Sequence, residues 1–316
     1  MIHRHRTVLV TGGAGFIGSH LVDRLVVDGY EVRVLDNLST GSWGNIRRHL
    51  GRKGFHFMKN DLTNPGALRR ALRGVEVVFH EAALASVPYS ITDPLSTNRV
   101  NTTGTLMLLK ESAKSGVQRL VYASSCSVYG DQGRRQISEK AVPRPMSPYA
   151  VSKLAAEEYC LAFDQLGKLE AVCLRYFNVY GPRQAFSPYS GVMTVFLERV
   201  RRKRPPVIWG DGTQTRDFVS IRDVVQANML AMTAKDASGE IFNIGTGKRT
   251  SIRRLAEIIV RASREGRLCP VHTSTRPGDI KHSCADIRKA RRTLGYSPSM
   301  TLEDYVNELM CNKEDR

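Results

Sequence analysis

A glycine-rich turn near the N-terminus constrains the fold of this chain more than any other feature. In "TVLVTGGAGFIGSHL", Gly12, Gly15 and Gly18 follow a short apolar run and precede a helical pattern. Glycines at this spacing permit a tight turn and a close approach of the backbone to a ligand, while a helix N-terminus stabilises phosphate. The segment therefore predicts a strand, a dinucleotide-binding turn and a helix from about Phe16 to Asp28.

An acidic residue after the next apolar run favours a ligand-binding turn over a glycine-rich turn that binds nothing. Asp36 closes "EVRVLD", eighteen residues after Gly18, where a carboxylate suits a ribose diol. The same carboxylate would repel the extra phosphate of NADP, so NAD is the predicted cofactor. Asp61 and Leu62, after the third predicted strand, are expected to border the adenine, although Asp61 is also typical of a turn residue.

Short apolar runs alternate with helical patterns through the first 178 residues. Runs such as "VEVVFH" and "RLVYASS" are largely apolar, which is typical of parallel strands covered on both faces. We therefore predict an α/β fold, with a Rossmann-type doubly wound parallel sheet in an NAD-binding domain of residues 1–178. Glycine, proline and polar residues then become frequent, which predicts a smaller α/β substrate-binding lobe over residues 179–316. Residues 216–244 are a candidate strand and helix that return to the first domain.

The chain carries a net charge of +17, from 47 Lys and Arg against 30 Asp and Glu among 316 residues. A nucleic-acid-binding protein, a site for anionic ligands and a basic solvated surface all fit this number. The basic residues are spread along the chain in short clusters such as "RRKR" (201–204), with no nucleic-acid-binding motif beside them. We expect mainly solvated surface and no nucleic-acid partner.

Cysteine and hydropathy patterns exclude other classes. The six cysteines form no CxxC pair and the eight histidines no HExxH motif, so neither a metal site nor a disulfide framework is predicted. No apolar run approaches the ~20 residues of a membrane span, and the N-terminus lacks the core of a signal peptide. A cytoplasmic protein without membrane contact is the expectation.

A tyrosine and a lysine one helical turn apart are the candidate acid–base centre. Tyr149 and Lys153 lie in "SPYAVSK", on a helix predicted from about Pro148 to Leu166, and share one face of it. Ser124 and Ser125 end the preceding strand. The Lys153 charge and a positive nicotinamide ring would lower the pKa of the Tyr149 phenol, which makes Tyr149 a general base. Without the glycine motif, a surface Tyr–Lys pair would be the simpler interpretation.

These motifs together resemble one enzyme family along nearly the whole chain. The stretches "TGGAGFIGSHL", "LDNLSTG", "HEAALASVPYSITDP", "SSCSVYG", "SPYAVSK", "RYFNVYGPRQ", "GDGTQTRDFV", "FNIGTG" and "RPGD" occur in the order seen in extended short-chain dehydrogenases/reductases. The resemblance is closest to the nucleotide-sugar 4-epimerases. It implies that C4 of a UDP-sugar is inverted through a transient 4-keto intermediate, with NAD taking and returning the hydride. It also implies a homodimer that pairs the helix of "SPYAVSK" with that of "TLMLLKESA".

The resemblance assigns further site residues. Besides Tyr149, Lys153 and Ser125 as catalytic residues, it implies that cofactor contacts come from Phe16, Ile17, Asn37, Ala82, Ala83, Asn101, Ser124 and Tyr176, with Phe177 bordering the nicotinamide. On the substrate side it implies Arg216, Arg276 and Asp279 at the diphosphate and ribose, with Asn178 and Ser125 nearer the sugar. Arginines suit a diphosphate because they pair with its negative charges.

The sugar is predicted from Ser283. In the epimerases a bulky tyrosine at the matching position is typical of enzymes restricted to hexoses, whereas a small residue leaves room for an N-acetyl group at C2. Ser283 therefore admits UDP-GlcNAc/UDP-GalNAc beside UDP-glucose/UDP-galactose, unless it is merely a small loop residue. Relatives that act on UDP-glucuronate tend to carry an arginine after "GPRQ", where this chain has Ala185, so glucuronate is less favoured.

Two other interpretations stay open at this point. A UDP-sugar dehydratase of the same fold would carry an acid pair after the strand-ending serine, but here Cys126 and Ser127 stand there. A non-catalytic dinucleotide sensor or nucleic-acid-binding relative would fit the charge. Such proteins usually lack the tyrosine or the lysine, and this chain keeps both.

Overall fold

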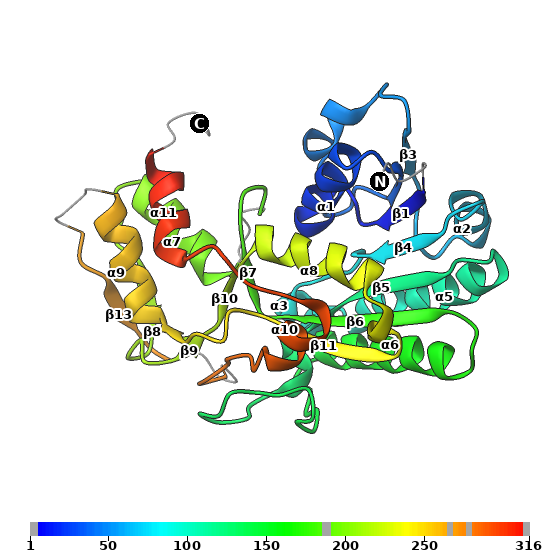
Figure 1. Cartoon of the computed structure of the whole chain (residues 1–316). Coiled ribbons are helices and arrows are strands. Elements are labelled where there is room, and N and C mark those ends of the chain that lie inside the picture. The colour runs from blue at the N-terminus through cyan, green and yellow to red at the C-terminus, as the bar shows by residue number, and fades with distance from the viewer. Residues whose placement is uncertain (1–5, 185–190, 264–267, 276–279, 312–316) are drawn as a thin grey trace.

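The computed structural model describes residues 6–184, 191–263, 268–275 and 280–311 (Figure 1). Within them, the central element is a parallel sheet of seven strands in the order β3-β2-β1-β4-β5-β6-β11. The strands are β1 (Thr7–Thr11), β2 (Glu31–Asp36), β3 (Phe55–Lys59), β4 (Val77–His80), β5 (Arg119–Ser125), β6 (Glu170–Tyr176) and β11 (Glu240–Ile244). The strand order reverses between β1 and β4, as in a doubly wound Rossmann sheet, so the predicted fold is confirmed.

Helices cover both faces of the sheet. One face carries α1 (Phe16–Val27) and α8 (Ile221–Thr233), and the other α2 (Pro65–Ala71), α5 (Gly104–Lys114) and α6 (Pro148–Gln165). Along β1, Val8 and Val10 pack toward α1 while Leu9 packs toward α5 and α6. Since successive strand side chains point to opposite faces, a strand that is apolar throughout is buried on both sides.

Short elements join the longer ones. They are η1 (Trp43–Asn45), η2 (Arg47–His49), α3 (Val87–Thr92), α4 (Pro94–Asn98), the π-helical turn η3 (Arg99–Thr103), η4 (Cys126–Tyr129) and η5 (Lys235–Ala237). The helix predicted across residues 102–116 is therefore η3 followed by α5.

A cap fixes where the helix of Tyr149 begins. The Ser147 hydroxyl accepts a hydrogen bond from the backbone N–H of Ala150 (3.2 Å), and Pro148 is the first helical residue of α6. The first N–H groups of a helix have no partner inside it, so a serine cap followed by proline sets its start. Tyr149 is thereby held in the first turn of α6.

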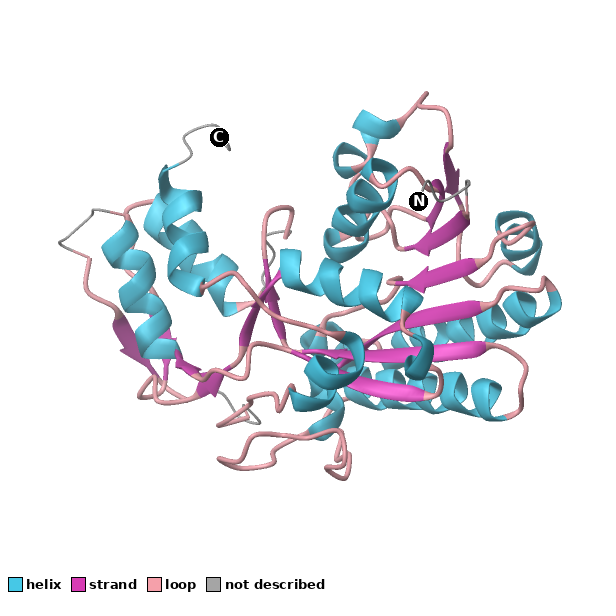
Figure 2. Cartoon of the chain, in the orientation of Figure 1, coloured by secondary structure: helices cyan, strands magenta, loops and turns pink. Residues whose placement is uncertain are grey.

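In the described residues, the second lobe is built from small sheets and helices (Figure 2). The sheet pairs are β7 (Asn178–Tyr180) with β10 (Phe218–Ser220), β8 (Val207–Trp209) with β13 (Val271–Thr273), and β9 (Thr215–Arg216) with β12 (Thr250–Ser251). The helices α7 (Val192–Arg201), α9 (Ile252–Ala262) and α11 (Leu302–Cys311) enclose a separate apolar core.

Three elements after residue 216 lie with the main sheet rather than with the second lobe. The helix α8 packs against α1, β11 pairs with β6 from Glu240–Val172 to Ile244–Tyr176, and α10 (Arg288–Leu294) packs on α8 and β11. The assignment of 1–178 and 179–316 to cofactor and substrate stays a prediction. Within the described ranges, no helix has the length and apolarity needed to cross a membrane.

Candidate active site

The turn between β1 and α1 can hold only glycine at two of the three predicted positions. Gly12 has φ +68°, and a Cβ there would lie 2.6 Å from the Ala82 nitrogen. A Cβ at Gly18 would lie 2.3 Å from the Gly12 carbonyl oxygen. A Cβ on Gly15 would meet only that same oxygen, at 3.1 Å, so its other side is open. Because the first turn of α1 contains no acidic residue, its N–H groups are suited to a pyrophosphate.

A cavity of about 470 Å³ lies over this turn, at the ends of β2, β3 and β4. Its lining includes the predicted cofactor residues Gly12, Gly15, Phe16, Ile17, Gly18, Asp36, Asn37, Asp61, Leu62, Ala82 and Ala83. The size of the cavity, its glycine turn and the acidic residues at its rim all fit a dinucleotide. Such a ligand would lie across the point where the strand order of the sheet reverses.

The acids on the rim are ordered by short hydrogen bonds. The Asp36 carboxylate accepts from the backbone N–H groups of Ala14 (2.9 Å) and Leu38 (2.7 Å). Burial raises its pKa, and those hydrogen bonds offset part of the rise. Burial also acts to raise the pKa of Asp61, but hydrogen bonds from Thr63 and Asn37 outweigh it and lower that pKa. Asp61 is thus both a turn residue and part of the cavity wall, so the two sequence interpretations are compatible.

Asn101 and Ser124 form hydrogen bonds that connect elements of the NAD-binding domain. The Asn101 amide donates to the Leu84 carbonyl (3.1 Å) and the Ser152 hydroxyl (3.0 Å), and its oxygen accepts from the Leu84 N–H (2.8 Å). The segment that follows β4 is thereby tied to α6. The Ser124 hydroxyl donates to Glu157 (2.6 Å). Neither side chain lines the cavity itself, so their predicted contact with the cofactor stays a prediction.

Tyr149 and Ser125 meet at the end of β5. Burial raises the pKa of the Tyr149 hydroxyl to about 12, and a hydrogen bond with the Ser125 side chain partly offsets the rise. The Ser125 hydroxyl also accepts from the Ser127 N–H (3.2 Å), which fixes its position at the start of η4. The protein's own groups therefore raise this pKa, and the predicted lowering depends on the positive nicotinamide ring.

Lys153 reaches the sheet rather than solvent. Its ammonium donates to the Ala123 carbonyl (2.7 Å) and lies 5.0 Å from the centre of the Tyr122 ring. Burial lowers the pKa of Lys153 to about 8, although the charge of Glu81 acts in the opposite direction. A buried lysine with a pKa near neutrality is typical of functional sites.

The predicted sugar-side residues approach from the second lobe. Ser283 is buried, and its N–H donates to the Thr215 carbonyl (3.1 Å). Burial raises the pKa of the Cys126 thiol to about 11, while a hydrogen bond with the Ser283 side chain and the charge of Arg216 lower it. Ser283, far along the chain, is thus adjacent to Cys126, which follows Ser125 directly.

Arg216 and Asn178 are placed by their neighbour Asp217. The buried Asp217 carboxylate accepts from Thr246 (2.8 Å to N and 2.6 Å to Oγ1) and from the N–H groups of Gly247 (2.9 Å) and Ala285 (3.1 Å). The Asp217 carbonyl accepts from the Asn178 N–H (2.9 Å). Asp217 therefore fastens β9 and β10 to the loops beside them. Arg276 and Asp279 lie outside the described residues.

Comparison with known proteins identifies the family. The model of the NAD dependent epimerase/dehydratase family matches residues 8–245. The chain belongs to this family. Its cofactor is therefore NAD, as predicted, and the chain is an enzyme of the extended short-chain dehydrogenase/reductase type.

Relatives that match nearly the whole chain include UDP-sugar 4-epimerases and, at lower identity, a UDP-glucuronic acid decarboxylase and a dTDP-glucose 4,6-dehydratase. The UDP-glucose 4-epimerase of Mycolicibacterium smegmatis is 39% identical, over 94% of this chain and 95% of its own. The crystal structure of UDP-glucose 4-epimerase from Thermotoga maritima with UDP-glucose has a TM-score of 0.89, at 38% identity, over 95% of this chain and 96% of that one. UDP-N-acetylglucosamine 4-epimerase from Methanobrevibacter ruminantium, in complex with UDP-N-acetylmuramic acid, has a TM-score of 0.90 at 37% identity, over 97% of both chains.

Glu81 is a site residue that sequence reasoning missed. It lines the cavity of this epimerase-family chain, accepts from the Tyr176 hydroxyl (2.9 Å), and Tyr176 in turn accepts from the Asn228 amide (2.8 Å). Burial raises the pKa of Glu81 to about 7, against the effects of Tyr176 and Lys153. In the sequence, Glu81 could have been found only as the single acidic residue of the apolar stretch "FHEAALA".

A buried ion pair behind α6 was also missed. Glu157 bonds Arg175 on β6 through two oxygens, at 2.5 Å and 3.0 Å, and the guanidinium lies 4.6 Å from the centre of the Tyr129 ring. Burial acts to lower the pKa of Arg175, but the Glu157 hydrogen bond and charge raise it overall. The periodicity of α6 places Glu157 on the Lys153 face, but it cannot identify a partner on another element.

Proposed function

We propose that the chain is an NAD-dependent UDP-sugar 4-epimerase, which inverts C4 through a transient 4-keto sugar. The observation that carries the proposal is that the side chains of Tyr149 and Ser125 interact at the end of β5, with the buried Lys153 one helical turn further along α6. Two hydroxyls converging on one substrate oxygen suit removal and return of its proton.

Each group has a distinct role in this proposal. When bound, NAD supplies a two-electron acceptor that takes the hydrogen of C4 with its electron pair and later gives it back. Tyr149 takes the proton of the 4-hydroxyl as the C4–O bond becomes a carbonyl, and returns it after the other face is reduced. Ser125 orients the same oxygen, and Lys153 places a positive charge at the end of β5, while lowering of the Tyr149 pKa depends on the positive nicotinamide ring. The net redox change is zero.

The substrate side of the proposal rests on Arg216 and Asn178. Arg216 is half-buried on β9 and acts electrostatically on Cys126 beside the catalytic serine, so its charge reaches the region where a sugar nucleotide would lie. Arg276 and Asp279 complete the proposed diphosphate and ribose contacts. Residues 179–316, apart from the segment of about 216–244 that returns to the first domain, would then form most of the substrate-binding lobe.

The proposed substrates are UDP-glucose/UDP-galactose and UDP-GlcNAc/UDP-GalNAc. The support is that Ser283 is small and adjacent to Cys126, one residue after Ser125. A tyrosine at 283 would fill the volume that an N-acetyl group needs. UDP-glucuronate is less favoured because Ala185 stands where relatives acting on it tend to carry arginine.

Dehydration is disfavoured by the same residues. Water loss from the sugar needs an acid near the leaving oxygen, but the Cys126 thiol has a pKa of about 11 and Ser127 contributes only a hydroxyl. The sensor or nucleic-acid-binding alternative finds no support, since the catalytic tyrosine and lysine are present and ordered. Cytoplasmic location stays a prediction.

We also propose a homodimer. Apolar side chains are exposed on three neighbouring helices: Ile91 (66%) on α3, Leu95 (82%) on α4, and Val151 (52%) on α6. Exposed apolar side chains on helices packed side by side are typical of surfaces that meet another chain. Sedimentation equilibrium should give twice the mass of 35.3 kDa. A monomer at micromolar concentration would contradict this proposal.

Substitution of the proposed base tests the chemistry. Tyr149→Phe removes the proton acceptor but keeps the ring, so we expect turnover of UDP-glucose to fall by roughly 10²–10⁴-fold. NAD binding and thermal stability should stay close to those of the parent enzyme. Coupled detection of UDP-galactose measures the rate, and near-normal turnover would remove Tyr149 from its role.

A further inference from the structure

Arg183 extends from the second lobe onto the first helix of the NAD-binding domain. It follows β7 and has a backbone φ of +65°, in the left-handed region that residues with a Cβ rarely adopt. A strained backbone persists only where surrounding contacts hold it, and such sites are often functional.

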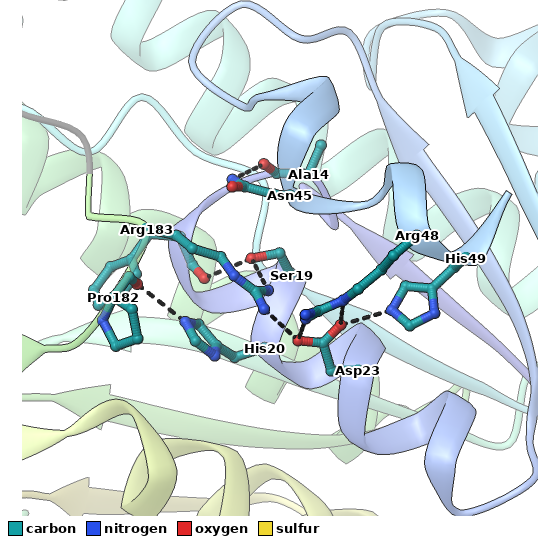
Figure 3. A network of polar contacts seen from close by, with 10 residues as sticks. Ala14, Ser19, His20, Asp23, Asn45, Arg48, His49, Pro182 and Arg183 are labelled. Carbon is teal, nitrogen blue, oxygen red and sulfur yellow. Dashed lines mark hydrogen bonds and ion pairs between the residues drawn. The ribbon is translucent and has the colours of Figure 1, made fainter. Parts of the chain in front are cut away.

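Pro182 and Arg183 both contact α1 (Figure 3). The Arg183 guanidinium donates to the Ser19 hydroxyl (3.1 Å) and to the Asp23 carboxylate (2.7 Å). Next to it, the Pro182 carbonyl lies 3.0 Å from the His20 ring nitrogen. The segment therefore rests on the side of α1, and its arginine bridges Ser19 and Asp23, which lie one helical turn apart.

The Asp23 carboxylate does not neutralise the cations around it. It also pairs with Arg48 and bonds the His49 ring (2.6 Å), both from η2. Burial acts to raise the pKa of Asp23, but His49, Arg48 and Arg183 outweigh it and lower that pKa, so the carboxylate is ionised. One carboxylate faces two guanidinium groups, which leaves an excess positive charge beside the middle of α1.

Arg183 is also part of the cavity wall. The 470 Å³ cavity is lined almost entirely by residues up to Val100, and Arg183 and Gln184 are the described lining residues that come from after β7. Arg48, which shares the same carboxylate, is not part of that lining. The two arginines of one ion cluster therefore differ in whether they line the cavity.

We propose that Arg183 is a latch that retains NAD. Its guanidinium, positioned by Ser19 and Asp23, places a positive charge against the pyrophosphate and covers the cofactor with a segment of the second lobe. Release of NAD then requires this cross-lobe contact to open. Retention suits an enzyme whose cofactor is unchanged at the end of each cycle. This benefit rests on the proposed epimerase function, whereas the proposed contact between Arg183 and NAD does not depend on it.

The test measures release of the reduced cofactor without turnover. Purified enzyme is loaded with NADH, a large excess of NAD⁺ is added, and the decay of protein-bound NADH fluorescence gives the dissociation rate. Removing a charged hydrogen-bonding partner should speed dissociation about ten-fold or more in Arg183→Ala and Arg183→Gln. Arg48→Ala should release NADH within about two-fold of the parent rate.

The two arginine variants separate the latch from a merely structural ion cluster. An unchanged rate in both Arg183 variants would overturn the proposal, as would an equal acceleration in Arg48→Ala. Absence of epimerase activity would leave these release rates interpretable.

Discussion

The buried pair of Glu157 and Arg175 gives the most quantitative test of how the catalytic edge is held together. Their side chains are 0% and 2% exposed, and the carboxylate accepts two hydrogen bonds from the arginine and one from Ser124. Glu157→Gln keeps the shape of the side chain but removes its negative charge. The amide N–H₂ of the glutamine would face the N–H donors of Arg175. An uncompensated guanidinium is then left in the core.

The expected loss follows from burial. Removing one partner of a buried ion pair costs about 3–5 kcal/mol of unfolding free energy. With about 2.1 cal/mol/K of unfolding entropy per residue, a chain of 316 residues has about 0.66 kcal/mol/K, so the melting temperature should fall by about 5–8 °C. Differential scanning fluorimetry of the purified enzyme measures this.

A surface pair of similar length provides the control. At the end of α7, the Nε of Arg202 lies 2.7 Å from the Glu198 carboxylate, and the two side chains are 62% and 26% exposed. Glu198→Gln should therefore lower the free energy of unfolding by less than about 1 kcal/mol. The double variant Glu157→Leu with Arg175→Met should melt above Glu157→Gln, because no buried charge is left unpaired. A Glu157→Gln melting temperature within the range of the Glu198 control would refute the reasoning.

Two further predictions concern substrate choice and pH. Ser283→Tyr should lower kcat/KM for UDP-GlcNAc by about 10–100-fold and leave kcat/KM for UDP-glucose nearly unchanged. The control variant Ser283→Ala should keep both values. Equal losses on the two substrates in steady-state assays would count against Ser283 as the determinant of substrate choice. The pKa of Glu81 rises from 4.5 to about 7 in the folded protein, so protonation of Glu81 stabilises the fold; this contribution is complete below about pH 4.5 and is lost as the pH rises through 7. The melting temperature of the parent should therefore fall by a few degrees relative to Glu81→Gln between those two pH values, and a constant difference would contradict the raised pKa.

The parts of the fold that sequence predicted are those set by local pattern. The glycine turn, the apolar strands and the Ser147–Pro148 start of α6 each follow from residues that lie near one another in the chain. The same holds for Tyr149 and Lys153, whose common face follows from helical periodicity. The family match reinforced these assignments because its motifs occur in order along the whole chain.

What the sequence did not predict depends on pairing between distant elements. Glu81 bonds Tyr176, and Arg183, which follows β7, bonds Asp23 on α1. No periodicity identifies such partners. The same limit applies to the pKa of Tyr149. Helical periodicity placed Tyr149 and Lys153 on one face, but it did not predict that burial raises the pKa of the phenol.

The central claim is that C4 is inverted by removal and return of the same hydrogen. Enzyme in its NAD-bound form is incubated with UDP-glucose carrying deuterium at C4, and the products are followed by NMR. We predict UDP-galactose that keeps the deuterium at C4 with inverted configuration. Loss of deuterium to solvent, or a keto or unsaturated sugar as the final product, would contradict the account.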